Sequence, residues 1–115
     1  MHELGIATEI VRLLENQRLQ RGFARVNIVR LRAGGLSGVD GQALQLAFEI
    51  ARDGSCAAGA VLQLEQRAMT LLCRPCGQES PCALGGGPET CPACGSSDLI
   101  IQGEEGIDVV SIEVD

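Results

Sequence analysis

Aromatic residues are almost absent from this sequence of 115 residues. Phe23 and Phe48 are the only two, and there is no tryptophan or tyrosine, although 45% of the residues are apolar. A core must therefore be assembled from many small aliphatic side chains, which at this length leaves a narrow margin over chain entropy. We expect one small domain with at most a smaller appendage, helped by a cross-link or a metal ion.

Basic residues are scarce as well, since nine Lys and Arg stand against fifteen Asp and Glu and give a net charge of −6. This balance argues against binding nucleic acid, and the lack of aromatics argues against base stacking. No apolar run reaches membrane-spanning length, and charged residues interrupt the amino-terminal segment, so we expect neither a membrane segment nor a signal peptide. We expect a cytoplasmic protein, in which six cysteines favour metal ligands over disulfides.

The hydrophobic periodicity predicts an α+β fold with two helices on a roughly three-stranded sheet. Residues 4–18 and 42–52 read as helices, and residues 24–33, 60–72 and 107–115 as strands of that sheet. The first helix is predicted to carry an apolar stripe of Leu4, Ala7, Val11 and Leu14, widened by Ile6, Ile10 and Leu13. We therefore predict an α+β domain over residues 1–72 plus 104–115, with a separate zinc-ribbon-like lobe over residues 73–103 inserted into it.

Two CxxC pairs give the strongest chemical signal in the sequence. The four residues are Cys73, Cys76, Cys91 and Cys94, and each pair is followed by a glycine. A two-residue gap lets two thiolates from one tight turn reach the same ion, and the glycine can take the positive φ that closes the turn. Two such turns supply four sulfurs for a tetrahedral Zn²⁺, with no coordination position left open, so we expect a structural site.

Other interpretations of these cysteines are two disulfides, unrelated thiols, or an iron centre of the rubredoxin type, because four thiolates also accept iron. Cys56 and Cys82 have no partner at metal-ligand spacing. We expect Cys56 to be a buried or incidental thiol. Cys82 is either an exchangeable fifth thiol near the metal or a plain loop cysteine.

The sole histidine, His2, stands at the amino terminus between Met1 and Glu3. The Met1 amine, the intervening amide and the His2 imidazole can chelate one ion in a plane, the geometry that suits Ni²⁺ or Cu²⁺, with Glu3 as a nearby carboxylate. Protons compete with the metal near neutral pH, so such a site binds weakly and releases readily. The competing interpretation is a frayed, solvated histidine at a chain end.

Several stretches together resemble the HypA/HybF family of hydrogenase nickel-incorporation proteins. These are "MHEL", "GGLSGVD" followed by "LAFE", "CRPCG" with "CPACG", and the final "VSIEVD". The resemblance covers nearly the whole chain in the right order. It implies a nickel site at Met1, His2 and Glu3, and it places Asp40 near that site in some members. Asp40 is equally well positioned to cap the second helix, and the two roles are compatible.

The resemblance implies a metallochaperone, with no catalytic activity, that binds Ni²⁺ transiently and delivers it for maturation of [NiFe]-hydrogenase and, in some organisms, urease. The implied partners are a nickel-handling GTPase accessory protein (HypB-like) and the precursor of the hydrogenase large subunit, with the chain itself a monomer or weak homodimer. The sequence has no phosphate-binding loop, so nucleotide hydrolysis must come from a partner. The alternative functions are a zinc-ribbon module for protein interaction or transcription, without nickel, and a rubredoxin-like electron carrier.

Overall fold

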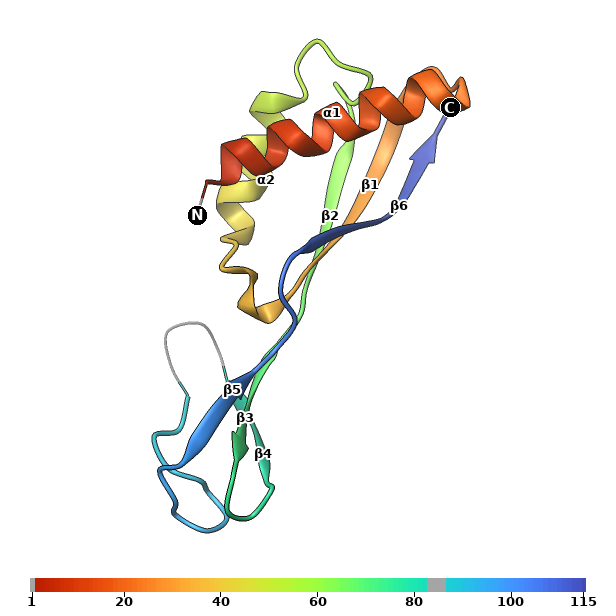
Figure 1. The fold of residues 1–115 in the computed structure, drawn as a ribbon. Coiled ribbons are helices and arrows are strands. Elements are labelled where there is room, and N and C mark those ends of the chain that lie inside the picture. Colours follow the sequence, from red (N-terminus) through yellow and green to blue (C-terminus); the bar gives the residue numbers. More distant parts are fainter. Residues whose placement is uncertain (1, 83–86) are drawn as a thin grey trace. The chain divides into compact units, whose positions relative to one another are not determined.

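The computed structural model describes residues 2–82 and 87–115 (Figure 1). In chain order the elements are α1 Glu3–Arg21, β1 Val26–Ala33, the 3₁₀ helix η1 Gly35–Ser37, α2 Gly41–Ala51, β2 Val61–Gln66, β3 Met69–Cys73, β4 Glu79–Cys82, β5 Leu99–Gln102 and β6 Ile107–Val114. The predicted α+β class with two helices is confirmed. Neither helix among the described residues is long and apolar enough to cross a membrane.

Residue contacts divide the chain into two compact units. The first unit consists of Met1–Arg32, Gly38–Glu65 and Asp108–Asp115, and the second of Ala33–Ser37 and Gln66–Ile107. The lobe expected from the sequence, residues 73–103, lies within the second unit.

The sheet of the first unit has the strand order β2-β1-β6. Figure 1 shows β1 running parallel to β2, with α2 as the crossover between them, and antiparallel to β6. The carboxyl-terminal segment is thus the third strand of this sheet, as the periodicity predicted. Val29 and Leu31 of β1 are buried, whereas Arg30, the residue between them, donates to Gln63 of β2 and to Glu113 of β6. One face of the sheet is therefore apolar and the other carries a polar cross-strand network.

Helix α1 continues past the predicted end at residue 18 and is capped at Gly22. This glycine has φ 78°, and its amide donates to the Arg18 carbonyl at 2.9 Å, which is a left-handed carboxyl-terminal cap. The predicted stripe was too wide: Ala7, Ile10 and Leu14 are buried, but Leu4 and Leu13 are exposed. Leu13 is rotated by about 100° from Leu14 around the helix axis, and Leu4 precedes the first buried position by one turn.

The prediction of a single strand over residues 60–72 is wrong. This stretch forms two strands, β2 and β3, which belong to different sheets. Between them the Arg67 amide donates to the Ala33 carbonyl at 2.9 Å. Apolar residues alternate within each strand, at Leu62 and Leu64 in β2 and at Met69 and Leu71 in β3, but such alternation does not identify the strand that each one pairs with.

The sheet of the second unit has the order β4-β3-β5, and both pairings are antiparallel. Leu71 of β3 lies opposite Ser80 on one side and Ile101 on the other, and Leu71 and Ser80 are buried. Strand β4 lies within the predicted zinc-ribbon-like lobe of residues 73–103. It is short, and its Pro81 is tolerated because β4 is an edge strand.

We predict that the Glu15 carboxylate stabilises the first unit in a pH-dependent way. Its Oε1 accepts from the Cys56 amide at 2.7 Å, and its Oε2 pairs with Arg18 at 3.2 Å. The amide bond from Cys56 is the main cause that lowers the pKa of Glu15. Glu15→Gln should reduce the free energy of unfolding at pH 7 by roughly 1 kcal/mol, measured by denaturant titration.

Because the folded-state pKa of Glu15 is depressed, this difference should be full above the ordinary carboxyl value of 4.5 and shrink as the pH falls below it. Glu9→Gln is the matched control, since Glu9 pairs with Arg12 at an exposed position, and its loss should change the free energy of unfolding by about 0.3 kcal/mol. Equal effects of the two substitutions at pH 7 would contradict the assignment.

Candidate metal centres

The four predicted cysteine ligands lie together in the second unit. They come from two turns of the same design, and they are Cys73, Cys76, Cys91 and Cys94. In the first turn the Gly77 amide donates to the carbonyl of the first cysteine at 2.8 Å, and in the second the Gly95 amide does the same at 2.8 Å. Both glycines have positive φ, 76° and 77°. The prediction that a glycine in this conformation closes each CxxC turn is therefore confirmed.

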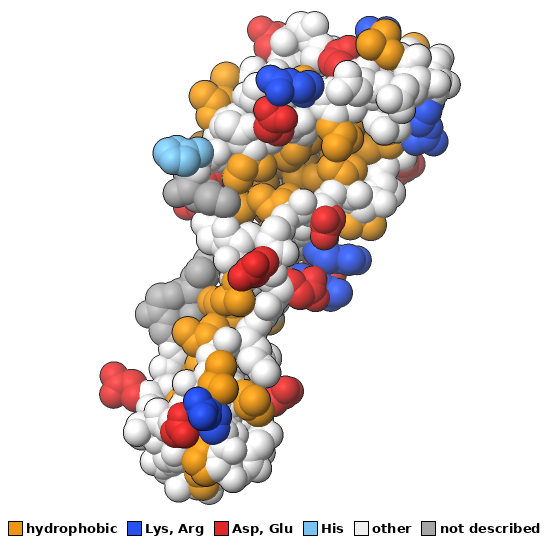
Figure 2. Space-filling view, viewed as in Figure 1, with side chains coloured by type: hydrophobic (Ala, Val, Ile, Leu, Met, Phe, Trp, Pro, Cys, Tyr) orange, Lys and Arg blue, Asp and Glu red, His pale blue; other side chains and the backbone are white. Residues whose placement is uncertain are grey.

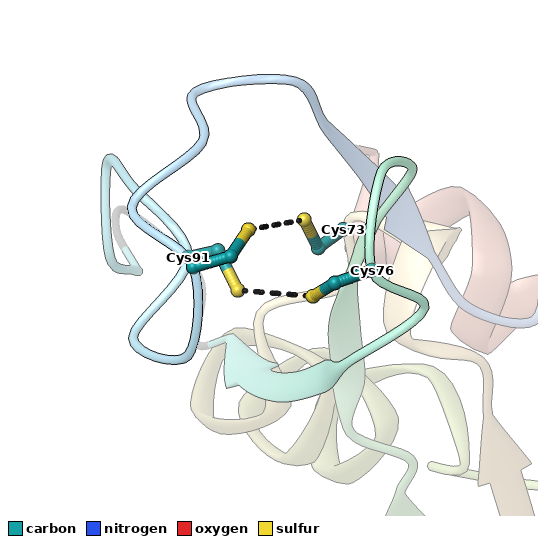
Figure 3. Close-up of side chains that lie close together, drawn as sticks. Cys73, Cys76 and Cys91 are labelled. Carbon is teal, nitrogen blue, oxygen red and sulfur yellow. Dashed lines mark hydrogen bonds between the residues drawn. The ribbon is translucent and has the colours of Figure 1, made fainter.

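The sulfur separations fit a tetrahedral ion. Figure 3 shows Cys73 and Cys76 pointing toward the turn that carries Cys91. The Sγ atoms of Cys73 and Cys94 are 3.5 Å apart, those of Cys76 and Cys91 3.7 Å, and all four lie within 4.8 Å of one another. Zn–S bonds of 2.3 Å imply sulfur separations of about 3.8 Å in a regular tetrahedron. A disulfide needs about 2.05 Å, so this geometry favours metal ligation over the disulfide interpretation.

The electrostatics of the cluster also indicate a cation. The Cys94 amide, helped by the Ala93 amide 3.4 Å from the sulfur, lowers the pKa of Cys91 to about 7. The Cys76 amide favours the Cys73 thiolate, but burial and hydrogen bonds with the other thiols outweigh it and raise the pKa of Cys73 to about 12. Four neighbouring thiolates cannot all ionise near neutral pH by themselves, and a divalent ion at their centre removes that penalty.

The two other cysteines lie outside the four-sulfur group. Cys56 is in the first unit, where burial and then the Glu15 carboxylate raise the pKa of its thiol. Cys82 is at the end of β4, opposite Met69 of β3. Within the described residues, neither of them belongs to the group of four ligand sulfurs that lie within 4.8 Å of one another.

The amino-terminal residues lie at the start of α1. Met1, whose amine the sequence suggested as a donor, is outside the described residues. His2 is exposed and occupies the N-cap position of α1, where its carbonyl accepts from the Ile6 amide at 3.1 Å and its imidazole makes no capping bond. The imidazole is therefore not used to hold the helix.

Glu3 and Asp40 are brought together although they are 37 positions apart in the chain. The Asp40 amide donates to Glu3 Oε2 at 3.2 Å. Asp40 Oδ1 in turn accepts from the amides of Gln42 and Ala43 at 3.0 and 3.1 Å, so the predicted N-cap of α2 is confirmed. Among the described residues, neither Glu3 Oε1 nor Asp40 Oδ2 takes part in a hydrogen bond or ion pair. These two carboxylate oxygens thus remain available, but the ligand atoms of His2, Glu3 and Asp40 do not lie within 4.8 Å of one another as those of the four cysteines do.

Sequence reasoning missed the bond that organises this corner. It placed Glu3 beside His2 through adjacency and Asp40 through the family resemblance, but it did not link Glu3 to the Asp40 backbone. Neither hydrophobic periodicity nor the spacing of residues in the sequence indicates that the start of a helix contacts a distant loop.

Comparisons with known proteins agree over the full length of the chain. A family model described as "Hydrogenase/urease nickel incorporation, metallochaperone, hypA" matches residues 1–114. The hydrogenase maturation factor HypA of Syntrophus aciditrophicus is 34% identical over 116 residues and covers 100% of both chains. The hydrogenase maturation factor HypA of Thermomicrobium roseum is 34% identical over an alignment of 128 residues, gaps included, that covers 99% of this chain and 98% of the relative.

A solved structure gives the same result. The solution structure of the Ni metallochaperone HypA from Helicobacter pylori superposes with a TM-score of 0.64 at 26% identity and covers 99% of this chain and 97% of that one.

We expect the second unit to lose its ordered turns when one ligand sulfur is removed. Cys76 is exposed, so Cys76→Ser removes a ligand without opening a cavity. Bound metal, measured by plasma mass spectrometry, should fall from stoichiometric to substoichiometric, because the tetrahedral set is incomplete. The Gly77 and Gly95 amides should lose hydrogen-exchange protection while α1 keeps its own. Cys82→Ser is the matched control, and a loss of metal equal to that of Cys76→Ser would refute the four-cysteine assignment.

Proposed function

Since this chain belongs to the HypA family of hydrogenase/urease nickel-incorporation metallochaperones, we propose that it binds Ni²⁺ at its amino terminus and passes it on for hydrogenase maturation. The family is one of metallochaperones and not of enzymes, so the chain carries its metal as cargo. The observation that supports the proposed site best is the bond between the Asp40 amide and Glu3, which holds Asp40 against the residue that follows the sole histidine.

The proposed donors are the Met1 amine, the His2 imidazole and the carboxylates of Glu3 and Asp40. An amine and an imidazole separated by one peptide unit form a chelate that suits the planar geometry of Ni²⁺. His2 supports this role because it is exposed and its ring makes no capping bond. The carboxylates add the negative charge that a divalent ion needs.

The proposed site is suited to transfer and not to storage. It is exposed, and it lies at the positive amino-terminal ends of α1 and α2, which disfavour a bound cation. An α-amine has an ordinary pKa of roughly 7.7–8.0, so protons compete for it near neutral pH. Planar nitrogen donors would also accept Cu²⁺ more tightly than Ni²⁺, so nickel supply and handover must provide the selectivity.

Asp40 can serve the helix and the ion at the same time. Its Oδ1 accepts both capping bonds of α2, which leaves Oδ2 for the metal. The capping bonds also fix the carboxylate in place, so little side-chain entropy is lost on ligation. Capping and ligation are therefore compatible functions of two different atoms.

The four-cysteine cluster is proposed to hold a structural Zn²⁺. Four thiolates leave no open position, and the ion supplies charge neutralisation and a cross-link between the two turns of the second unit. An iron centre has the same ligand number, and the colour of the purified protein separates the two.

The proposed partners follow from what the chain lacks and from its family. A HypB-like GTPase would supply the nucleotide hydrolysis, and the hydrogenase large-subunit precursor, or in some organisms a urease, would receive the nickel in the cytoplasm. The alternative function is a zinc-ribbon interaction module that binds no nickel.

The nickel proposal is tested by titrating Ni²⁺ into the untagged protein and two variants. His2→Ala removes one nitrogen donor and should weaken binding by at least about tenfold, measured by calorimetry. Inserting one glycine between Met1 and His2 keeps every side chain and enlarges only the chelate ring, and it should weaken binding as well. Zinc content should be unchanged in both variants.

If the wild type and both variants bind nickel alike, or none binds it, the amino-terminal site is wrong and the zinc-ribbon alternative is favoured.

A pair of substitutions separates the two functions of Asp40. Asp40→Asn keeps a capping oxygen and removes the charge, so α2 should retain its amide protection while nickel affinity falls. The fall should be about fivefold or more, since a unit charge near the ion is worth about 1 kcal/mol even in water. Asp40→Ala should lose the affinity and also lower the free energy of unfolding by about 1 kcal/mol. Unchanged nickel affinity in both variants would restrict Asp40 to capping.

A further inference from the structure

The first turn of α1 lacks a side chain at a position where helices commonly carry a hydrogen-bond acceptor. His2 is the N-cap of α1, so Gly5 occupies the third helical position. A glutamate or glutamine at that position reaches back and accepts a hydrogen bond from the backbone amide of the N-cap residue. Gly5 is the only glycine in α1, and it provides no such acceptor.

The fold does not require a glycine at position 5. Gly5 is exposed, and it is not among the glycines with positive φ, unlike Gly22 at the other end of the helix. Beyond the helix backbone and the adjoining residues, a Cβ added at Gly5 would meet only the His2 Cβ among the described residues, at 3.9 Å. This distance is an ordinary van der Waals contact, so a side chain would fit and would extend directly beside His2.

The two helix starts differ in what their N-cap amides bind. At α2 the Asp40 amide donates to Glu3 Oε2 at 3.2 Å, so that hydrogen is already bonded. At α1 the His2 carbonyl accepts from the Ile6 amide, but no described residue accepts a hydrogen bond from the His2 amide. Figure 2 shows the sole histidine, in pale blue, at the surface of the molecule. The His2 amide is thus an open backbone group next to an open imidazole.

We propose that Gly5 keeps the His2 amide nitrogen open to Ni²⁺, an inference that rests on the proposed amino-terminal site. This nitrogen joins the planar chelate only when it loses its proton, which passes to water or buffer as the Ni–N bond forms. A side-chain acceptor at residue 5 would hold the N–H in a hydrogen bond that ligation must break. Glycine imposes no such cost, so Gly5 is a positioning residue that acts through His2.

The backbone of His2 already suits the chelate, so helix flexibility is not what Gly5 provides. With φ −91°, the His2 Cβ lies about 30° from its own N–H when viewed along the N–Cα bond. The imidazole and the amide nitrogen can therefore face one metal position while α1 keeps its first turn. This distinguishes an open amide from a merely weakened helix, because glycine lowers the helix-forming equilibrium up to about fivefold relative to alanine.

The test compares Gly5→Gln with Gly5→Ala in the untagged, zinc-loaded full chain. Both introduce a good helix former at an exposed position, but only glutamine carries an acceptor that reaches the His2 amide. Nickel affinity, measured by calorimetry, should fall about fivefold in Gly5→Gln, the factor that one hydrogen bond of ordinary net strength represents. Gly5→Ala should stay within about twofold of the wild type. The visible absorption band of planar nickel should require a higher pH in Gly5→Gln, because the amide proton is harder to remove.

Amide exchange in the absence of nickel measures the hydrogen bond itself. The His2 amide, observed by NMR at mildly acidic pH, should exchange more slowly in Gly5→Gln than in Gly5→Ala. Equal exchange of this amide in the two variants, or equal nickel affinity, would overturn the proposal. His2→Ala separates this failure from failure of the site. If His2→Ala binds nickel as the wild type does, the amino-terminal site is wrong, whereas if it loses nickel and the two Gly5 variants bind alike, only the inference about Gly5 is wrong.

Discussion

The hydrogen bond from the Asp40 amide to the Glu3 carboxylate is the constraint on which the amino-terminal site depends. It ties the first turn of α1 to the residue that caps α2, and so it fixes two helix starts at one place. Both starts carry the positive end of a helix dipole, and each is balanced by one of these carboxylates. Each carboxylate accepts a backbone hydrogen bond with one oxygen, so Glu3 and Asp40 are held in place before a metal ion binds. The second oxygen of each carboxylate remains available as a metal donor. In the proposed site, helix geometry and metal binding would thus use the same two side chains.

The near absence of aromatic residues has different consequences in the two units. The first unit compensates with two helices packed on a sheet, and its core is filled by residues such as Leu14, Leu31, Leu44 and Phe48. The second unit has only Leu71, Ser80 and two cysteines buried among its described residues in Gln66–Ile107. So small a core cannot offset the chain entropy of the whole lobe. The proposed metal ion, held by four sulfurs, would supply the missing constraint, which would explain why the cysteines are concentrated where apolar residues are few.

Features carried by local spacing could be predicted from the sequence, and features carried by distant pairing could not. The CxxC turns, the left-handed cap at Gly22 and the Asp40 cap each depend on residues close in the chain, and each is present. The division of residues 60–72 into β2 and β3 depends on which strands lie beside them, and the exposure of Leu4 and Leu13 depends on how far the packing partners of α1 extend. The contact of Glu3 with the Asp40 backbone is of the same kind. For the site, residue types were therefore predictable, and the atom-by-atom assignment of Asp40 Oδ1 to the helix was not.

The two proposed metal sites also differ in a way that keeps their ions apart. Nickel binds thiolates as well as nitrogen, so affinity alone would not exclude it from the cysteine cluster. Geometry does: four thiolates held by two rigid turns impose a tetrahedron, which suits zinc, whereas an amine, an imidazole and carboxylates permit the planar arrangement that nickel prefers. A filled tetrahedral site also has no vacant position through which ligands can exchange quickly. In this proposal a closed set of like donors would retain the structural ion, whereas the cargo ion would be released because its donors are mixed, exposed and open to competition from protons.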